Sequence, residues 1–99
     1  MISFIDIAAA VSRVRSRYDV REAYLFGSFA RGEQTPDSDI DLRLVCGDSM
    51  TFGALCEISL ELEEELGRVV EIVTNPPEHM RPAFRKNIEQ DEVRLYEVP

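Results

Sequence analysis

The sequence lacks the marks of exported, membrane-spanning and disulfide-stapled proteins. It has two cysteines in 99 residues, Cys46 and Cys56, and their spacing fits no metal site. No apolar run approaches the roughly 20 residues that a membrane span requires, and the first residues show neither the basic nor the apolar part of an export signal. We therefore expect reduced thiols that are buried or half-buried, no membrane partner and a cytoplasmic location.

Positive charge is also scarce. The chain has 11 basic and 19 acidic residues, which gives a formal net charge of −8. The imbalance lies in residues 35–75, which hold ten acidic and two basic residues. Because nucleic-acid binding depends on neutralising phosphates with Lys and Arg, we expect no direct nucleic-acid partner. The charge favours a basic protein partner or a nucleotide whose charge is masked by metal.

Apolar periodicity predicts alternating helices and strands in one domain that spans residues 1–99. We expect a first helix capped by Ser3, a helical turn at 28–32, a helix at 51–66 and a last helix from 78 or 79 to 89, with strands at 21–26, 39–45, 68–74 and 93–96. This order predicts an α/β (α+β) fold in which a small mixed sheet has its helices packed on one face.

Two charged helix faces are open to interpretation. Arg13, Arg15 and Arg17 lie near the end of the first helix, where cations suit the helix dipole. They form either a solvated face or a patch that docks a partner or steers a triphosphate. The glutamates between residues 57 and 65 have no metal-site geometry of their own, and we interpret them as a solvated face.

Residues 27–41 combine the features of a phosphate loop and a metal site. Gly27 and Ser28 follow an apolar run, and a glycine there lets the backbone turn tightly and approach a ligand. Backbone N–H groups at the start of the next helical turn attract phosphate. After ten more residues, Asp39 and Asp41 share one face if they open a strand. Two such carboxylates suit Mg²⁺ or Mn²⁺, so the stretch predicts phosphoryl or nucleotidyl transfer.

Two further charged residues interrupt apolar strands. Glu71 lies in the middle of the third expected strand, where an unpaired carboxylate would be costly to bury. We expect it to be the third metal ligand, with Asp39 and Asp41; the plainer alternatives are an exposed edge position or a pair with Arg43. Arg43 follows Asp41 on the same strand face and is expected either to meet the acceptor substrate or to neutralise Glu71.

The motif resembles the signature of the DNA polymerase beta-type nucleotidyltransferase superfamily. The matching positions are the Gly-Ser pair, Ala30-Arg31-Gly32, Ser38 and the Asp-x-Asp pair. In so short a chain the resemblance is closest to the minimal nucleotidyltransferases that act as antitoxins of HEPN toxins. Glu71 stands where the superfamily usually has Asp, and Glu92 stands where Gly is usual.

The resemblance implies a Mg²⁺-dependent transfer of AMP from ATP to a hydroxyl group, that of a tyrosine, on a cognate HEPN-type toxin. The implied catalytic and metal-binding residues, which would hold two Mg²⁺ ions, are Asp39, Asp41 and Glu71. The implied nucleotide-binding residues are Gly27, Ser28, Arg31 and Ser38. Larger members of the superfamily hold the acceptor with a second domain, so here a partner would supply that surface in a hetero-oligomer.

Several roles remain open at this point. Ser28 either binds a phosphate oxygen or caps the helical turn. Arg31 either contacts the triphosphate or braces the loop through Asp37 or Asp39, and Ser38 is expected to orient the start of the second strand.

Two other functions compete with AMP transfer to a toxin. A non-catalytic antitoxin would neutralise a basic toxin by contact, through the acidic surface of residues 57–65. Nucleotidyl transfer to a small molecule would need a partner subunit to complete the pocket.

Overall fold

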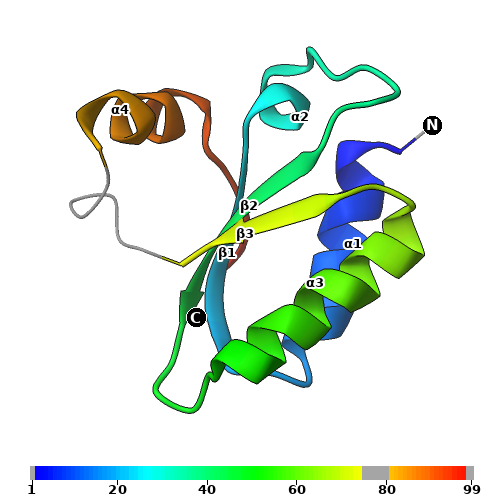
Figure 1. The fold of residues 1–99 in the computed structure, drawn as a ribbon, viewed down its shortest axis with the longest axis vertical. Helices are drawn as coiled ribbons and strands as arrows, with labels where there is room; N and C mark the ends of the chain where they lie inside the picture. Colours follow the sequence, from blue (N-terminus) through cyan, green and yellow to red (C-terminus); the bar gives the residue numbers. More distant parts are fainter. Residues whose placement is uncertain (1, 75–80, 98–99) are drawn as a thin grey trace.

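The computed structural model describes residues 2–74 and 81–97. Four helices and four strands follow each other along these residues (Figure 1), in the order α1 (Phe4–Arg15), β1 (Val20–Phe26), α2 (Ser28–Arg31), β2 (Ile40–Cys46), α3 (Phe52–Leu66), β3 (Val70–Val73), α4 (Pro82–Asp91) and β4 (Val93–Glu97).

The four strands form one mixed sheet with the order β3-β2-β1-β4. Strand β1 runs antiparallel to both β2 and β4, while β2 and β3 are parallel. Helices α1 and α3 lie side by side on one face of the sheet, and α4 lies on the opposite side (Figure 1). The mixed sheet and the α/β fold class that the sequence predicts are therefore confirmed. The expected packing of the helices on one face holds for α1 and α3 but not for α4, which lies on the other face.

Alternation along the strands separates the core from a second face. Ile40 and Leu42 of β2 are fully buried against α1 and α3, and Leu25 of β1 joins them in the same cluster. Residues between these positions point away from the core because successive strand side chains alternate. We call this other side the site face; its members in the three strands β1, β2 and β3 are Tyr24, Asp41, Arg43 and Glu71.

Helix-end chemistry agrees with the sequence. Ser3 caps α1 and exchanges hydrogen bonds with Asp6 in a capping box. Thr51 caps α3, which ends at Gly67, a glycine in the left-handed conformation with φ of 67°. Pro82 occupies the first position of α4, where its missing N–H is harmless. The part of the last helix expected at 78–80 lies outside the described residues.

Two strands begin later than expected. Strand β2 begins at Ile40, so Asp39 lies one residue before it, and β3 covers only Val70–Val73. The free edge of β3 is met by α3 instead of by another strand. Glu63 accepts a hydrogen bond from the Val70 N–H at 2.9 Å, and Ser59 donates to the Val70 carbonyl at 3.2 Å.

Helices α1 and α3 are joined by charges. Arg17 pairs with Glu61 through two hydrogen bonds of 2.6 and 3.0 Å, Arg13 pairs with Glu65, and the Tyr18 hydroxyl donates to Glu57 at 3.1 Å. Arg13 and Arg17 are therefore part of the helix–helix contact and do not form a free basic patch. Glu57, Glu64 and Glu65 are exposed, as expected of a solvated face, although Glu57 and Glu65 also make these contacts.

The structure bears on the expected state of the cysteines and on the expected absence of a membrane span. Cys46 and Cys56 are both free; Cys46 is half-buried, as expected, whereas Cys56 is exposed. Within residues 2–74 and 81–97, no helix is both long enough and apolar enough to cross a membrane.

Candidate active site

The bend after β1 lies directly against the acidic strand. Phe26 and Asp41 are cross-strand partners, and Gly27 turns the chain with a φ of 76° into the single-turn helix α2. A Cβ atom placed on Gly27 would run into the Asp41 carboxylate. The absence of a side chain at Gly27 thus lets the backbone approach Asp41 closely. The structure brings together the Gly-Ser pair and the Asp-x-Asp pair, as the motif predicts.

Glu71 comes to Asp41 from the neighbouring strand. In the parallel pair of β2 and β3 the two residues are register partners, and Glu71 is close enough to raise the pKa of the Asp41 carboxyl group. Asp41 is half-buried, while Glu71 is exposed at the edge strand. Asp39 lies exposed just before β2 and adds a third negative charge near Asp41. We call Asp39, Asp41 and Glu71 the acidic cluster.

Burial and neighbouring negative charge make ionisation of Asp41 unfavourable. Burial is the largest influence and raises the pKa of Asp41, from the usual 3.8 to about 6, with further increases from the charge and hydrogen bond of Glu71 and from the charge of Asp39. Arg31, on α2, acts in the opposite direction and lowers this pKa. At pH 7 the Asp41 carboxylate is mostly ionised and lacks enough positive charge nearby.

The donor set of the cluster fits a hard divalent cation, although its geometry is not preformed. Carboxylate oxygens are the ligands that Mg²⁺ and Mn²⁺ take, and the raised pKa of Asp41 marks negative charge that a cation would neutralise. In the part of the chain that is described, no group of three or more His, Cys, Asp or Glu side chains is arranged so as to hold a metal ion.

The other predicted residues surround the cluster. Ser28 is half-buried and is the first residue of α2; Gly27 holds the N-cap position, so the capping alternative for Ser28 was wrong. Arg31 Nε lies 3.2 Å from a carboxylate oxygen of Glu33. Ser38 Oγ accepts a hydrogen bond of 2.8 Å from the Thr35 N–H and closes the turn that precedes β2. Its position agrees with the expected orienting role.

Arg43 has a different partner from those expected. Its Nε donates to Glu92 Oε2 at 2.7 Å and its Nη2 donates to Glu92 Oε1 at 2.8 Å. The expectations that Arg43 meets the acceptor or neutralises Glu71 were therefore wrong, because its guanidinium is buried and bound elsewhere. Glu92 was not predicted as the partner of Arg43. The rule that a charged residue in an apolar strand needs a partner, applied to Glu71, would have demanded a partner for Arg43 as well.

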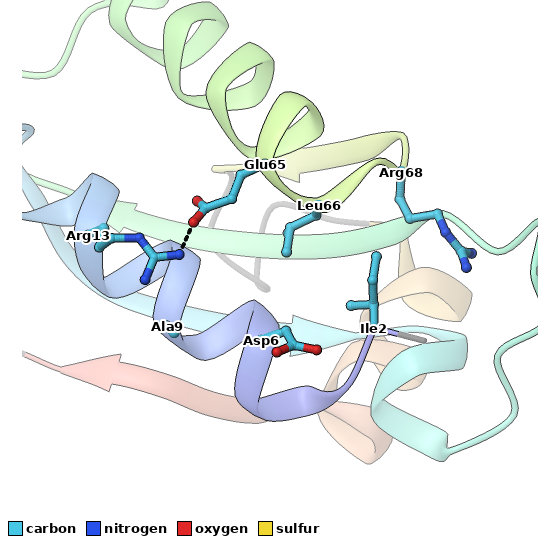
Figure 2. A pocket seen from close by; sticks show the side chains of 7 residues that line it. All are labelled: Ile2, Asp6, Ala9, Arg13, Glu65, Leu66 and Arg68. Carbon is cyan, nitrogen blue, oxygen red and sulfur yellow. Dashed lines mark ion pairs between the residues drawn. The ribbon is translucent and has the colours of Figure 1, made fainter.

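A groove on the molecule lies away from the acidic cluster. It has a volume of about 590 Å³ and lies between α1 and the end of α3. Figure 2 shows the Arg13–Glu65 ion pair beside the apolar side chains of Ile2 and Leu66 that line it. Because it is on the helical side of the sheet, it contains no residue of the predicted site.

Comparison with known proteins places the chain in a family. A family model described as "Polymerase beta, Nucleotidyltransferase" matches residues 5–98. The chain therefore belongs to the polymerase beta-type nucleotidyltransferase family, and the predicted enzyme class is confirmed. The motif of Gly27, Ser28, Asp39 and Asp41 led to the same family from the sequence.

The related sequences carry a more specific description. The chain is 38% identical over 80 residues to a Methanocaldococcus jannaschii protein named "Putative protein adenylyltransferase MJ1379", which covers 79% of each chain. It is 34% identical over 67 residues to the protein adenylyltransferase MntA of Thermococcus cleftensis, which covers 68% of each chain.

Solved structures share the fold. A toxin–antitoxin crystal structure with AMP-PNP superposes with a TM-score of 0.74 at 20% identity, over 92% of this chain and 73% of that chain. A complex of tri-AMPylated Shewanella oneidensis HEPN toxin with an MNT antitoxin gives a TM-score of 0.66 at 18% identity, over 93% of this chain and 71% of that chain. The minimal nucleotidyltransferase fold is thereby confirmed.

Proposed function

We propose that the protein transfers AMP from ATP to a tyrosine hydroxyl of a HEPN-type toxin and thereby acts as its antitoxin. The observation that carries this proposal is the contact between the Gly27 bend and the acidic cluster at Asp41. A glycine bend that leads into a helical turn beside three carboxylates suits nucleotidyl transfer, because the turn can bind phosphate and the carboxylates can bind a cation. The names of the related adenylyltransferases and the AMPylated toxin of the Shewanella complex support the same acceptor class.

The chain's own residues divide the work between the two substrates. Ser28 and the backbone N–H groups of the bend would bind phosphate oxygens of ATP, with Arg31 close enough to influence charge at Asp41. Ser38 holds the turn before Asp39 in place. The acceptor oxygen forms its new bond with the α-phosphorus while the bond to the β-phosphate oxygen breaks and pyrophosphate leaves.

The acidic cluster is the proposed site of the metal. Asp39, Asp41 and Glu71 would hold divalent cations, two in this proposal and Mg²⁺ in the cell, which when bound neutralise the phosphates and lower the pKa of the acceptor hydroxyl. Glu71 has the longer side chain of the three and reaches the cluster from the neighbouring strand, as the register partner of Asp41.

The structure argues against neutralisation of the toxin by contact alone. That alternative relied on a free acidic surface over residues 57–65. Glu65 is instead paired with Arg13 of α1, and Glu61 with Arg17, which follows α1. Two of the five glutamates in this surface are therefore already paired with a cation and attract a basic partner less.

The test is to mix the protein with Mg²⁺, ATP labelled at the α-phosphate and the HEPN-type product of the neighbouring gene. We expect label on the partner protein, and no label when Mg²⁺ is removed by a chelator. Tight binding of the partner without label would support the contact-only antitoxin. Label on a small molecule, with none on the partner, would support nucleotidyl transfer to a small molecule.

We also propose that the reaction takes place in the cytoplasm. ATP is the proposed substrate, and the thiols of Cys46 and Cys56 are free, which fits a reducing compartment.

A further inference from the structure

A second charged group is buried on the site face, two residues along β2 from Asp41. The side chains of Arg43 and Glu92 are 10% and 16% exposed, whereas both members of the Arg17–Glu61 pair are at least 37% exposed. The two parallel hydrogen bonds of 2.7 and 2.8 Å hold Arg43 and Glu92 in one relative orientation. A buried pair of this geometry restricts its two elements far more than a surface pair does.

The guanidinium is also held from the β1 side. It lies over the ring of Tyr24, its cross-strand partner, with 4.4 Å between Cζ and the ring centroid. The Tyr24 hydroxyl donates in turn to Glu22 of the same strand. Arg43 is therefore fixed to the sheet through two strands before it reaches Glu92.

Glu92 is the single residue between α4 and β4. Its bond to Arg43 ties the end of α4 to the centre of the site face, and α4 is the helix that lies on this side of the sheet (Figure 1). We propose that Arg43 and Glu92 are positioning residues, a clamp that holds α4 in place as the acceptor-side wall of the nucleotidyltransferase site.

The choice of the acceptor side rests on the proposed function. There, Gly27 and Ser28 take the nucleotide at the end of β1, so the acceptor hydroxyl has to approach the acidic cluster from elsewhere on the site face. The charge of Arg43 is taken up by Glu92, whereas Arg31 is the cation that lowers the pKa of Asp41. Arg43 therefore affects the reaction by holding α4 in place, and its charge does not act on the acidic cluster.

A double-mutant cycle tests the clamp. Arg43→Met, Glu92→Met and the double variant are assayed for label transfer at varied concentrations of the HEPN-type partner and of ATP. We expect each single change to raise the KM for the partner about fivefold or more, with the double variant no worse than either, because paired residues are not additive. The KM for ATP stays within about twofold of wild type, since the nucleotide side is untouched. Arg43→Lys, which keeps the charge, restores part of the loss.

Arg17→Met is the matched control, because it breaks an exposed ion pair with two hydrogen bonds on the helical side of the sheet, the Arg17–Glu61 pair. It is expected to leave both KM values unchanged. An unchanged KM for the partner in both single variants, or an equal rise in both KM values, overturns the clamp.

Hydrogen exchange separates failure of the clamp from failure of the proposed function. In Arg43→Met the backbone amides of α4 are expected to exchange faster, with those of α3 unchanged. If the wild-type protein transfers no label to the partner, the proposed function fails, and the exchange measurement still decides the clamp. Unchanged amide exchange in α4 of Arg43→Met then overturns the clamp. Faster exchange confined to α4 and β4 supports the clamp.

Discussion

Asp41→Asn is expected to reduce AMP transfer at least a thousandfold while making the protein without metal more stable. Asn keeps the shape of Asp but removes the charge that the proposed cations need, and loss of a metal ligand removes most of the transition-state stabilisation, of which each factor of ten is about 1.4 kcal/mol. The measurements are label transfer to the partner and urea unfolding in the presence of a chelator.

The gain in stability follows from the sign of the Asp41 shift. Its pKa in the folded state is raised from 3.8 to about 6, so the folded protein binds this proton more tightly than the unfolded chain does. The contribution of Asp41 to wild-type stability therefore falls as pH rises through the window from about 4 to about 6. Above this window the ionised Asp41 destabilises the fold by about 1 kcal/mol, after discounting the shift for partial exposure to solvent.

The pH dependence supplies the control for this prediction. The stability difference between Asp41→Asn and wild type should be near zero at pH 4, grow to pH 6 and stay level above it. Asp48→Asn, a change at an exposed turn residue, should leave both stability and activity close to wild type. A constant difference at all pH values, or an Asp41 variant that keeps its activity, would contradict the account.

Gly27→Ala is expected to lose both stability and activity. The backbone at Gly27, with φ of 76° and ψ of −157°, lies in a region that is almost exclusive to glycine. Any side chain there is strained and also collides with the Asp41 carboxylate. We expect a loss of about 1–3 kcal/mol in the free energy of unfolding and, because Asp41 is displaced, at least a tenfold loss of label transfer.

Gly67→Ala is a matched control for the collision. Gly67 also has a positive φ, of 67°, but a Cβ there meets no atom within 4 Å. This change should cost about 1 kcal/mol of stability and leave the rate of label transfer unchanged under folding conditions. If both glycine variants lose activity equally, the contact between the bend and Asp41 has no specific role.

Local rules predicted most of the fold. The capping box of Ser3 and Asp6, the cap of α3 at Gly67 and the alternation in β2 each depend on a few neighbouring residues, and all are present. The motif also predicted that Gly27 and Asp41 would meet. These features were readable because chain spacing alone determines which side chains share a face.

Contacts between distant elements were not predictable in the same way. The pairing of Arg43 with Glu92 joins residues 49 positions apart, and the Arg17–Glu61 pair joins residues 44 positions apart. Each charge has many possible partners in the sequence, and only the packing of α4 and of α1 against α3 selects one. Strand β3 was predicted at 68–74 but is shorter, Val70–Val73, and an α3 side chain, Glu63, accepts a hydrogen bond from the Val70 N–H.

The most direct test of the proposed site is a crystal structure with Mn²⁺ and a non-hydrolysable ATP analogue. Anomalous scattering locates the Mn²⁺ ions in it. We expect manganese peaks between the carboxylates of Asp39, Asp41 and Glu71, with the triphosphate against the Gly27 bend. Manganese bound elsewhere, or a Glu71 carboxylate that does not coordinate it with the nucleotide in place, would contradict the acidic cluster as the metal site.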